Sequence, residues 1–100
     1  MKVNVQSVNF NADQKLIDFL QEKMDKLEIY FDKIINADVY LKVQNTGEPE
    51  NKITEILLGI PGDDLMVKRT SKTFEEGIDE GVSTLRRQLQ KRKEKLSAHV

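Results

Sequence analysis

The stretch TFEEGIDEGVSTLRRQLQKRKEKL, residues 73–96, decides the fold, because its pattern predicts one long amphipathic helix. Its apolar residues recur at spacings of three, four or seven, which places them in one stripe along a helix of about 3.6 residues per turn. These residues are Phe74, Ile78, Val82, Leu85, Leu89 and Leu96. Thr73 stands three residues before Glu76, in the Ser/Thr-x-x-Glu pattern whose side chains satisfy free backbone N–H groups of a first turn. Thr73 is therefore the predicted N-cap, and the apolar stripe must face a core.

The charges of this helix are ordered along its length. Its first turns are acidic, whereas residues 86–95 carry six cations against the single anion Glu94. We call these cations the basic ridge: Arg86, Arg87, Lys91, Arg92, Lys93 and Lys95. About two or three cations would complement the helix dipole, so the ridge exceeds what helix stability requires. It spans roughly 10–15 Å, long enough to follow several phosphates, although a solvated helix end explains the same charges.

The rest of the chain predicts four strands and one more helix. Apolar and polar residues alternate, as in half-buried strands, in residues 2–9, 37–44, 52–60 and 65–70. Helical spacing predicts a helix from the N-cap Asp13 to near residue 32, and Pro61-Gly62 predicts a type II turn. The order β-α-β-β-β-α predicts one α+β domain, residues 1–100. We expect a four-stranded sheet, with its last three strands in an antiparallel meander and both helices packed on one face.

The composition indicates a globular protein with little net charge. The chain has 38% hydrophobic and 33% charged residues and a net charge of −1, whereas a generic nucleic-acid-binding domain is strongly basic. The distribution of the charged residues matters more than the net charge, because the cations concentrate at the end of the long helix. Cysteine is absent, and no segment has the apolar block of a signal peptide or the roughly 20 apolar residues of a membrane span. We therefore expect a cytoplasmic protein, monomeric in isolation, with one cationic face and no membrane partner.

The sequence contains no arrangement of residues typical of catalysis. The single histidine, His99, lies next to the chain end, and without cysteine the ligands of a zinc site and the partners of a catalytic nucleophile are missing. Turn chemistry explains Asp63-Asp64, and the helix dipole explains the acidic residues 75–80. The segment GIPGDD, residues 59–64, lacks the spacing and the lysine of a phosphate-binding loop. We predict no enzyme activity, no cofactor, no metal and no small-molecule substrate.

Two glycines and several further cations complete the pattern of the two helices. Gly77 and Gly81 lie four residues apart on one face of the long helix, which permits close approach to the sheet or to the first helix; contact with a partner is the alternative.

Lys23 and Lys26 are expected on the solvent side of the first helix. If the helices pack side by side, these lysines extend the basic ridge into a surface for structured RNA. Further candidates for this surface are Lys68, Arg69, Lys72, Tyr40 and Tyr30, although Tyr30 also suits the edge of the core.

Two segments carry a resemblance to a known family. They are KMDKLEIYFDKIINADVYLKV, residues 23–43, and FEEGIDEGVSTLRRQLQKRKEKL, residues 74–96. With compatible length between them, the chain resembles, over nearly its whole length, the bacterial ribosome hibernation-promoting factors and ribosome-associated translation inhibitors. The resemblance implies a β-α-β-β-β-α domain that lodges between the head and body of the small ribosomal subunit. There it would occupy the path of messenger and transfer RNA and halt translation in non-growing cells.

The resemblance also implies which residues contact ribosomal RNA. The family's basic contacts fall on Lys23, Lys26, Arg87, Lys91, Lys93 and Lys95, with Arg86 and Arg92 as additions. They would neutralise phosphates and so place the protein without reading bases. The chain departs from the family pattern at RTSKTF, residues 69–74, which weakens the case for Lys68, Arg69 and Lys72. Long-form members continue into a second domain that pairs two ribosomes, so we expect that activity to be missing here; the resemblance does not decide whether the short form assists or blocks pairing.

Two other interpretations remain open at this point. A double-stranded-RNA-binding module shares an α-β-β-β-α core, so the expected fold is double-stranded-RNA-binding-domain-like, but such modules place basic residues where the final helix begins. Here that helix begins with Glu75 and Glu76. A protein–protein adaptor would instead use the uncovered sheet face or Gly77 and Gly81. Salt separates the adaptor from the RNA binders, because phosphate contacts weaken as salt rises.

Overall fold

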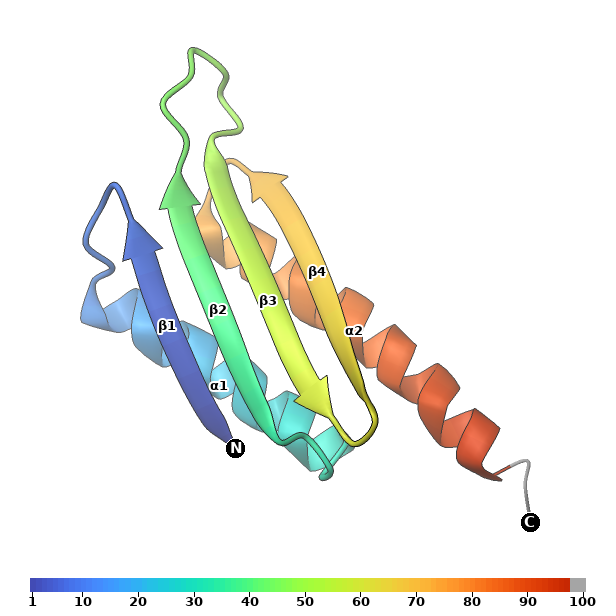
Figure 1. Ribbon diagram of the computed structural model, residues 1–100. Helices are drawn as coiled ribbons and strands as arrows, with labels where there is room; N and C mark the ends of the chain where they lie inside the picture. The colour runs from blue at the N-terminus through green and yellow to red at the C-terminus, as the bar shows by residue number, and fades with distance from the viewer. Residues whose placement is uncertain (98–100) are drawn as a thin grey trace.

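Four strands and two helices follow one another in the predicted order (Figure 1). The computed structural model describes residues 1–97, and His99 and the side chain of Leu96 lie outside the described part. The elements are β1 Lys2–Val8, α1 Gln14–Tyr30, β2 Asn36–Val43, β3 Lys52–Ile60, β4 Asp63–Ser71 and α2 Phe74–Ser97. The predicted α+β class and element order are therefore confirmed.

The four strands form one sheet in the order β1-β2-β3-β4. The last three strands pair antiparallel, as predicted, whereas β1 pairs with β2 in parallel. A parallel neighbour requires a crossover connection, and α1 supplies it. The register aligns Val5 with Val39, Val39 with Ile56, and Ile56 with Val67, so one apolar row crosses all four strands. This row faces the helices.

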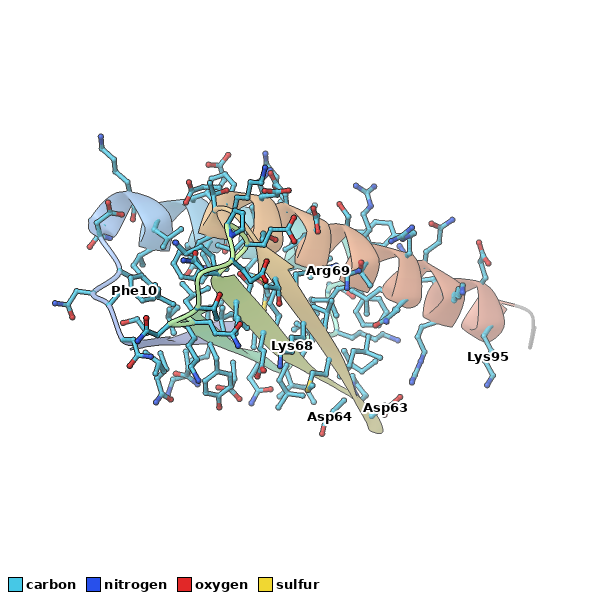
Figure 2. All side chains as sticks on the ribbon, turned by 90° about the horizontal axis from the view of Figure 1, so that it is seen from above. Phe10, Asp63, Asp64, Lys68, Arg69 and Lys95 are labelled. Atoms are coloured by element: carbon cyan, nitrogen blue, oxygen red, sulfur yellow. The ribbon has the colours of Figure 1, made fainter. Side chains whose placement is uncertain are left out.

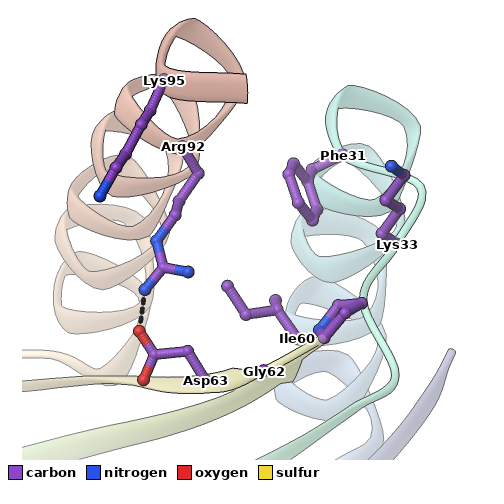
Figure 3. A pocket seen from close by; sticks show the side chains of 8 residues that line it. Phe31, Lys33, Ile60, Gly62, Asp63, Arg92 and Lys95 are labelled. Atoms are coloured by element: carbon purple, nitrogen blue, oxygen red, sulfur yellow. Dashed lines mark ion pairs between the residues drawn. The ribbon is translucent and has the colours of Figure 1, made fainter. Parts of the chain in front are cut away.

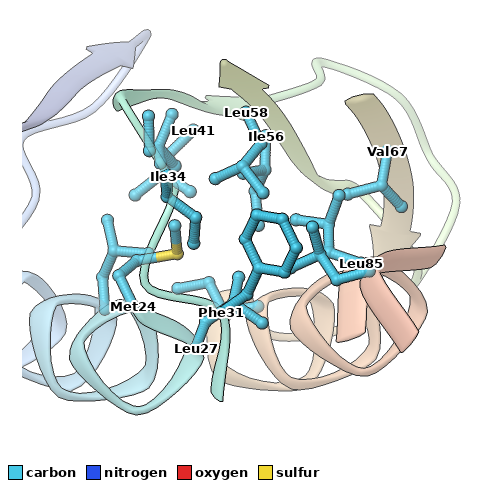
Figure 4. Packing of buried hydrophobic residues seen from close by; sticks show 14 of the residues in the cluster. Met24, Leu27, Phe31, Ile34, Leu41, Ile56, Leu58, Val67 and Leu85 are labelled. Atoms are coloured by element: carbon cyan, nitrogen blue, oxygen red, sulfur yellow. The ribbon is translucent and has the colours of Figure 1, made fainter. Parts of the chain in front are cut away.

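Both helices cover the same face of the sheet, with α1 and α2 side by side (Figure 1). Alternate residues of β2 and β3 point into the layer between sheet and helices, and Leu41, Ile56 and Leu58 are fully buried there. Figure 4 shows Met24 and Leu27 of α1 and Leu85 of α2 packed against these strand residues. The other sheet face has no helix over it and exposes Tyr40 and Met66 at 40% and 61%.

The predicted helix starts are confirmed by their hydrogen bonds. Asp13 Oδ1 accepts from the Leu16 N–H at 2.9 Å, and Thr73 Oγ1 accepts from the Glu76 N–H at 3.1 Å. Each bond satisfies one of the backbone donors left free in a first helical turn. The first helix ends two residues earlier than predicted, because Phe31 is extended and acts as the C-cap.

The β3–β4 hairpin is longer than the sequence pattern predicted. The pattern placed the fourth strand at residues 65–70, whereas β4 spans Asp63–Ser71. The turn at Pro61-Gly62 is tight, with Gly62 at φ +80°, so Ile60 already pairs with Asp63. A positive φ at the second central residue is the feature of a type II turn that requires glycine.

Gly77 and Gly81 allow α2 to lie close to the sheet. A Cβ at Gly77 would come within 2.7 Å of Thr54 Oγ1, and one at Gly81 within 3.2 Å of Ile56 Cδ1. The atoms approached belong to β3, so the glycines serve packing on the sheet. The prediction of close approach is confirmed, and the glycines approach the sheet rather than the first helix.

Candidate nucleic-acid interface

The basic ridge lies where α2 runs past the end of the sheet. Figure 1 shows that α1 and α2 run in the same direction, so their C-terminal ends and the β3–β4 turn gather at one end of the molecule. The chain measures 52 Å along its longest axis and 24 Å and 19 Å across it. Figure 2 shows Lys95 well beyond the sheet, toward the end of α2. The cations of α2 are therefore presented on a projecting helix.

Arg86 and Lys93 lie on the side of α2 that faces α1, and we call them the inner row. The Arg86 Cζ atom lies 4.6 Å and the Lys93 Nζ atom 4.5 Å from the centre of the half-buried Tyr30 ring. At partly exposed sites each cation–π contact stabilises by about 0.5–1 kcal/mol. Tyr30 thus holds two cations of α2 from the end of α1. This role was missed from the sequence, where Tyr30 was predicted as a flat contact or a core-edge residue.

Lys93 also completes the C-terminal end of α1. Its Nζ donates to the Tyr30 carbonyl oxygen at 3.0 Å, and α1 has no basic residue in its own last turn. The last carbonyl groups of a helix lack partners within the helix and carry its negative dipole end. Lys93 therefore has a structural contact in addition to its predicted role in binding.

Arg87, Lys91 and Lys95 follow one another at intervals of four residues, and we call them the outer row. All three are exposed. Within residues 1–97, none of them has a carboxylate oxygen within 4.0 Å, and Arg87 Nη2 makes only a long contact of 3.4 Å to Thr84 Oγ1. These charges are available to an anionic partner along a line of about 12 Å.

Arg92 differs from its neighbours because it points back toward the sheet. It forms an ion pair with Asp63 of the β3–β4 turn, and the two side chains are 37% and 43% exposed. The pair ties the projecting part of α2 to the hairpin. The prediction that Arg92 contacts RNA stays a prediction, and the structure gives this residue a partner within the protein.

The two predicted lysines of α1 also have acidic neighbours. Lys23 is half-buried rather than on an open solvent side, because its Nζ lies 2.9 Å from Asp79 Oδ1 of α2. Lys26 pairs with Glu22 at 3.4 Å within α1. Both line a small groove between the helices, together with Arg86 of the inner row. The structure therefore brings them to the basic ridge, as the side-by-side packing predicted.

The three cations before α2 do not form one patch with the ridge. Lys68 lies on the uncovered sheet face and pairs with Glu55 at 3.7 Å, whereas Arg69 points toward α2 (Figure 2). Arg69 donates to Thr84 Oγ1 at 2.8 Å and lies 3.8 Å from Glu80. Of these three cations, Arg69 comes near the outer row, because Arg69 and Arg87 both donate to the Thr84 hydroxyl. Lys72 is exposed where β4 leads into α2.

Neither metal ligands nor a membrane-spanning helix is found in the described part. No group of three or more His, Cys, Asp or Glu residues within residues 1–97 is placed to hold a metal ion. Over the same residues, neither helix combines the length and apolar character needed to cross a membrane. The expectations of no metal, no cofactor and no catalysis stay predictions.

The chain matches a known protein family over nearly its whole length. A model of the family described as Sigma 54 modulation protein / S30EA ribosomal protein matches residues 3–97, from β1 to the end of α2. The chain therefore belongs to this family, and the resemblance found in the sequence is confirmed.

Two similar curated proteins are ribosome hibernation promoting factors. The ribosome hibernation promoting factor of Pseudomonas putida is 35% identical over 95 residues, which are 95% of this chain and 89% of the relative. The ribosome hibernation promoting factor of Escherichia coli strain K12 is 30% identical over 99 residues, which are 99% of this chain and 100% of the relative. The similarity therefore extends over essentially the whole of both chains.

Two solved structures share the fold. A ribosomal subunit interface protein from Coxiella burnetii superposes with a TM-score of 0.82 at 18% identity, covering 93% of this chain and 98% of the other. The N-terminal domain of Thermus thermophilus Protein Y gives a TM-score of 0.72 at 22% identity, covering 90% and 93%. At these identities the likeness establishes the fold.

Proposed function

We propose that this chain is a ribosome hibernation factor that binds the small ribosomal subunit. It occupies the path of messenger and transfer RNA and thereby inhibits translation in non-growing cells. The basic ridge, with Lys23 and Lys26, neutralises phosphates of ribosomal RNA and positions the protein without reading bases. The protein acts as a single domain, monomeric when free, and is ribosome-associated in the cytoplasm.

The outer row is the observation that carries this proposal. Arg87, Lys91 and Lys95 are exposed on one line of a projecting helix, and no carboxylate within residues 1–97 lies close enough to pair with them. Aligned cations of this kind suit a polyanion, because each one displaces a counterion from a phosphate. The names of the two relatives above, which match over nearly their full lengths, support the ribosome as the source of that polyanion.

Co-sedimentation with vacant ribosomes and separated subunits, at low and at moderate salt, tests the proposal. We expect the protein to migrate with the small subunit at low salt and to dissociate as salt rises. The triple variant Arg87→Glu, Lys91→Glu and Lys95→Glu should fold normally and lose this binding. The variant Lys2→Glu, Lys15→Glu and Lys42→Glu has the same change in net charge at exposed residues away from the ridge, so it is the matched control and should still bind.

Two results would contradict the proposal. Absence of the protein from every ribosomal fraction at low salt would remove the ribosome as target. Equal loss of binding in both triple variants would remove the ridge as the site, because the effect would then depend on net charge alone.

Ribosome binding that is insensitive to salt would instead support an adaptor that uses the uncovered sheet face. The double-stranded-RNA module is disfavoured because the exposed first turn of α2 is acidic.

A further inference from the structure

A cavity of about 500 Å³ lies at the end of the molecule where both helices finish. It is bordered by the C-terminal end of α1, the β3–β4 turn and the last turns of α2, and it opens to solvent (Figure 3). Its apolar side is formed by the exposed Pro61 and by the edges of Phe31 and Ile60, which are otherwise buried in the core. Small-molecule sites in proteins typically have about 300–1,000 Å³, so this cavity is large enough for a ligand the size of one nucleotide.

The rim of the cavity is cationic. Lys33 comes from the segment after α1, and Arg92 and Lys95 come from α2. Among residues 1–97, Lys33 and Lys95 have no carboxylate oxygen within 4.0 Å. Arg92 is paired with Asp63, and both side chains of this pair face the cavity (Figure 3). The cavity thus offers an apolar surface, two available ammonium groups and one carboxylate–guanidinium pair.

We propose that this cavity binds one unstacked nucleotide. The base lies against Phe31, Ile60 and Pro61, and its phosphate lies between Lys33 and Lys95. An inorganic anion would leave the apolar side uncovered, and an uncharged apolar molecule would leave the lysines without a partner. A nucleotide covers the apolar side and also gives the lysines a partner, since it joins a flat ring system to a phosphate.

Arg92 gives the cavity a preference for guanine. Asp63 already pairs with Arg92 through one carboxylate oxygen and accepts from the Asp64 N–H at 2.8 Å through the other. The remaining N–H groups of the Arg92 guanidinium are donors, and the O6 and N7 atoms of guanine accept from such a group side by side. Adenine presents an N6 amino donor in place of O6, so it offers the guanidinium one acceptor instead of two. The preferred ligand is therefore a guanosine nucleotide.

The cavity is continuous with the basic ridge, because Arg92 and Lys95 belong to both. The nucleotide is either a guanosine that leaves the stack of an RNA bound along the ridge or a free guanosine nucleotide. The first source rests on the proposed function and adds base recognition to it, since proteins read RNA sequence mostly at unstacked bases. The second source does not depend on ribosome binding.

Titration of the full chain with guanosine 5′-monophosphate, followed by amide NMR, tests the proposal. We expect saturable shifts at the amides of Phe31, Lys33, Gly62 and Asp63, with a dissociation constant of about 1 mM or tighter. Adenosine 5′-monophosphate and ribose 5-phosphate should bind at least about tenfold more weakly. The exposed variant Lys33→Ala should lower the affinity about tenfold, whereas Lys42→Ala, on the uncovered sheet face, should leave it unchanged.

Failure of this proposal can be told apart from failure of the proposed function. Shifts that ribose 5-phosphate or inorganic phosphate reproduces, no shifts at the cavity, or a Lys33→Ala variant with unchanged affinity would overturn the nucleotide site, whatever the result with ribosomes. The double variant Arg87→Glu and Lys91→Glu changes no residue that lines the cavity, so it addresses ribosome binding alone.

A short single-stranded RNA that contains one guanosine identifies the source. If it shifts the same amides at lower concentration than the free nucleotide, the ligand is a guanosine of RNA. If the free nucleotide binds more tightly, the ligand is a free guanosine nucleotide. Either result supports the cavity as a nucleotide site.

Discussion

The two halves of α2 differ in what surrounds them, although they form one continuous helix. The first half lies against β3 and β4, where Gly77, Ile78 and Leu85 are buried. The second half buries Leu89, extends past the sheet and carries the exposed outer row of cations. The comparison teaches that the buried stripe of a single helix stabilises the fold while its exposed outer row is available for binding. Substitutions of the buried residues should therefore change folding, and substitutions in the outer row should change binding.

The largest effect on folding should come from Leu85→Ala in the first half. Leu85 is fully buried between the sheet and α1, and deletion of a buried leucine side chain costs about 2–5 kcal/mol. Chemical denaturation should show this loss of unfolding free energy. Ile29→Ala is the control, because Ile29 is 84% exposed on α1 and should change stability by less than about 0.5 kcal/mol. Equal losses in the two variants would contradict the assigned packing of α2.

A smaller destabilisation is expected for Gly77→Ala. The added Cβ would meet Thr54 Oγ1 at 2.7 Å and Ser71 Oγ at 3.3 Å, and overpacking costs about 1–3 kcal/mol against a gain in helix propensity of about 1 kcal/mol. The net loss should be about 1 kcal/mol. Gly47→Ala, where a Cβ meets nothing within 4 Å, is the control and should be neutral or slightly stabilising.

The Gly77 explanation can be tested further with a second substitution. Thr54→Ala removes the hydroxyl that a Cβ at Gly77 would approach most closely. In the double variant, Gly77→Ala should therefore cost less than it does alone, and a double-mutant cycle of unfolding free energies measures the difference. Strict additivity would indicate that the Thr54 contact does not limit the approach of α2.

The inner row connects the second half of α2 to α1, because Tyr30 of α1 contacts two cations of α2. Tyr30→Leu should lower stability by about 1 kcal/mol through the two lost cation–π contacts. It should also weaken ribosome binding, since Arg86 and Lys93 are then less well positioned. Tyr30→Phe keeps the ring and should restore both properties. If Tyr30→Phe lowers stability and ribosome binding as much as Tyr30→Leu does, the hydroxyl rather than the ring is responsible.

The smallest expected difference separates two lysines of the ridge. Lys93→Gln should lower the unfolding free energy by about 0.5–1 kcal/mol, because Lys93 completes the C-terminal end of α1. Lys91→Gln should leave the unfolding free energy unchanged, since Lys91 belongs to the outer row. Thermal unfolding of both variants measures this difference. Ribosome affinity should fall by similar factors in both, so identical stabilities would contradict the capping role of Lys93.

Much of the fold could be predicted from the sequence, because local patterns determine it. The apolar stripe of α2, the N-caps Asp13 and Thr73 and the turn at Pro61-Gly62 each follow from the chemistry of neighbouring residues. The place of β1 could not be predicted in this way. Its parallel pairing with β2 depends on contacts between residues more than 30 positions apart, such as Val5 and Val39.

The candidate site was only partly predictable for the same reason. Helical spacing places Arg87, Lys91 and Lys95 at intervals of four residues and Arg86 and Lys93 seven residues apart, but it does not show which of these cations have partners. The Arg92–Asp63 pair and the contacts of Lys93 with Tyr30 join distant segments. Lys33 was missed altogether, because nothing in its local sequence indicates the cavity that the helix ends and the hairpin border.

The salt dependence of small-subunit affinity tests the central claim most directly. Each phosphate contact contributes about 0.7–0.9 to the slope of log affinity against log salt concentration. We predict a steep slope for the unmodified protein and a slope lower by about 2–3 for the variant Arg87→Gln, Lys91→Gln and Lys95→Gln. An unchanged slope in that variant would contradict the claim that the outer row binds ribosomal RNA phosphates.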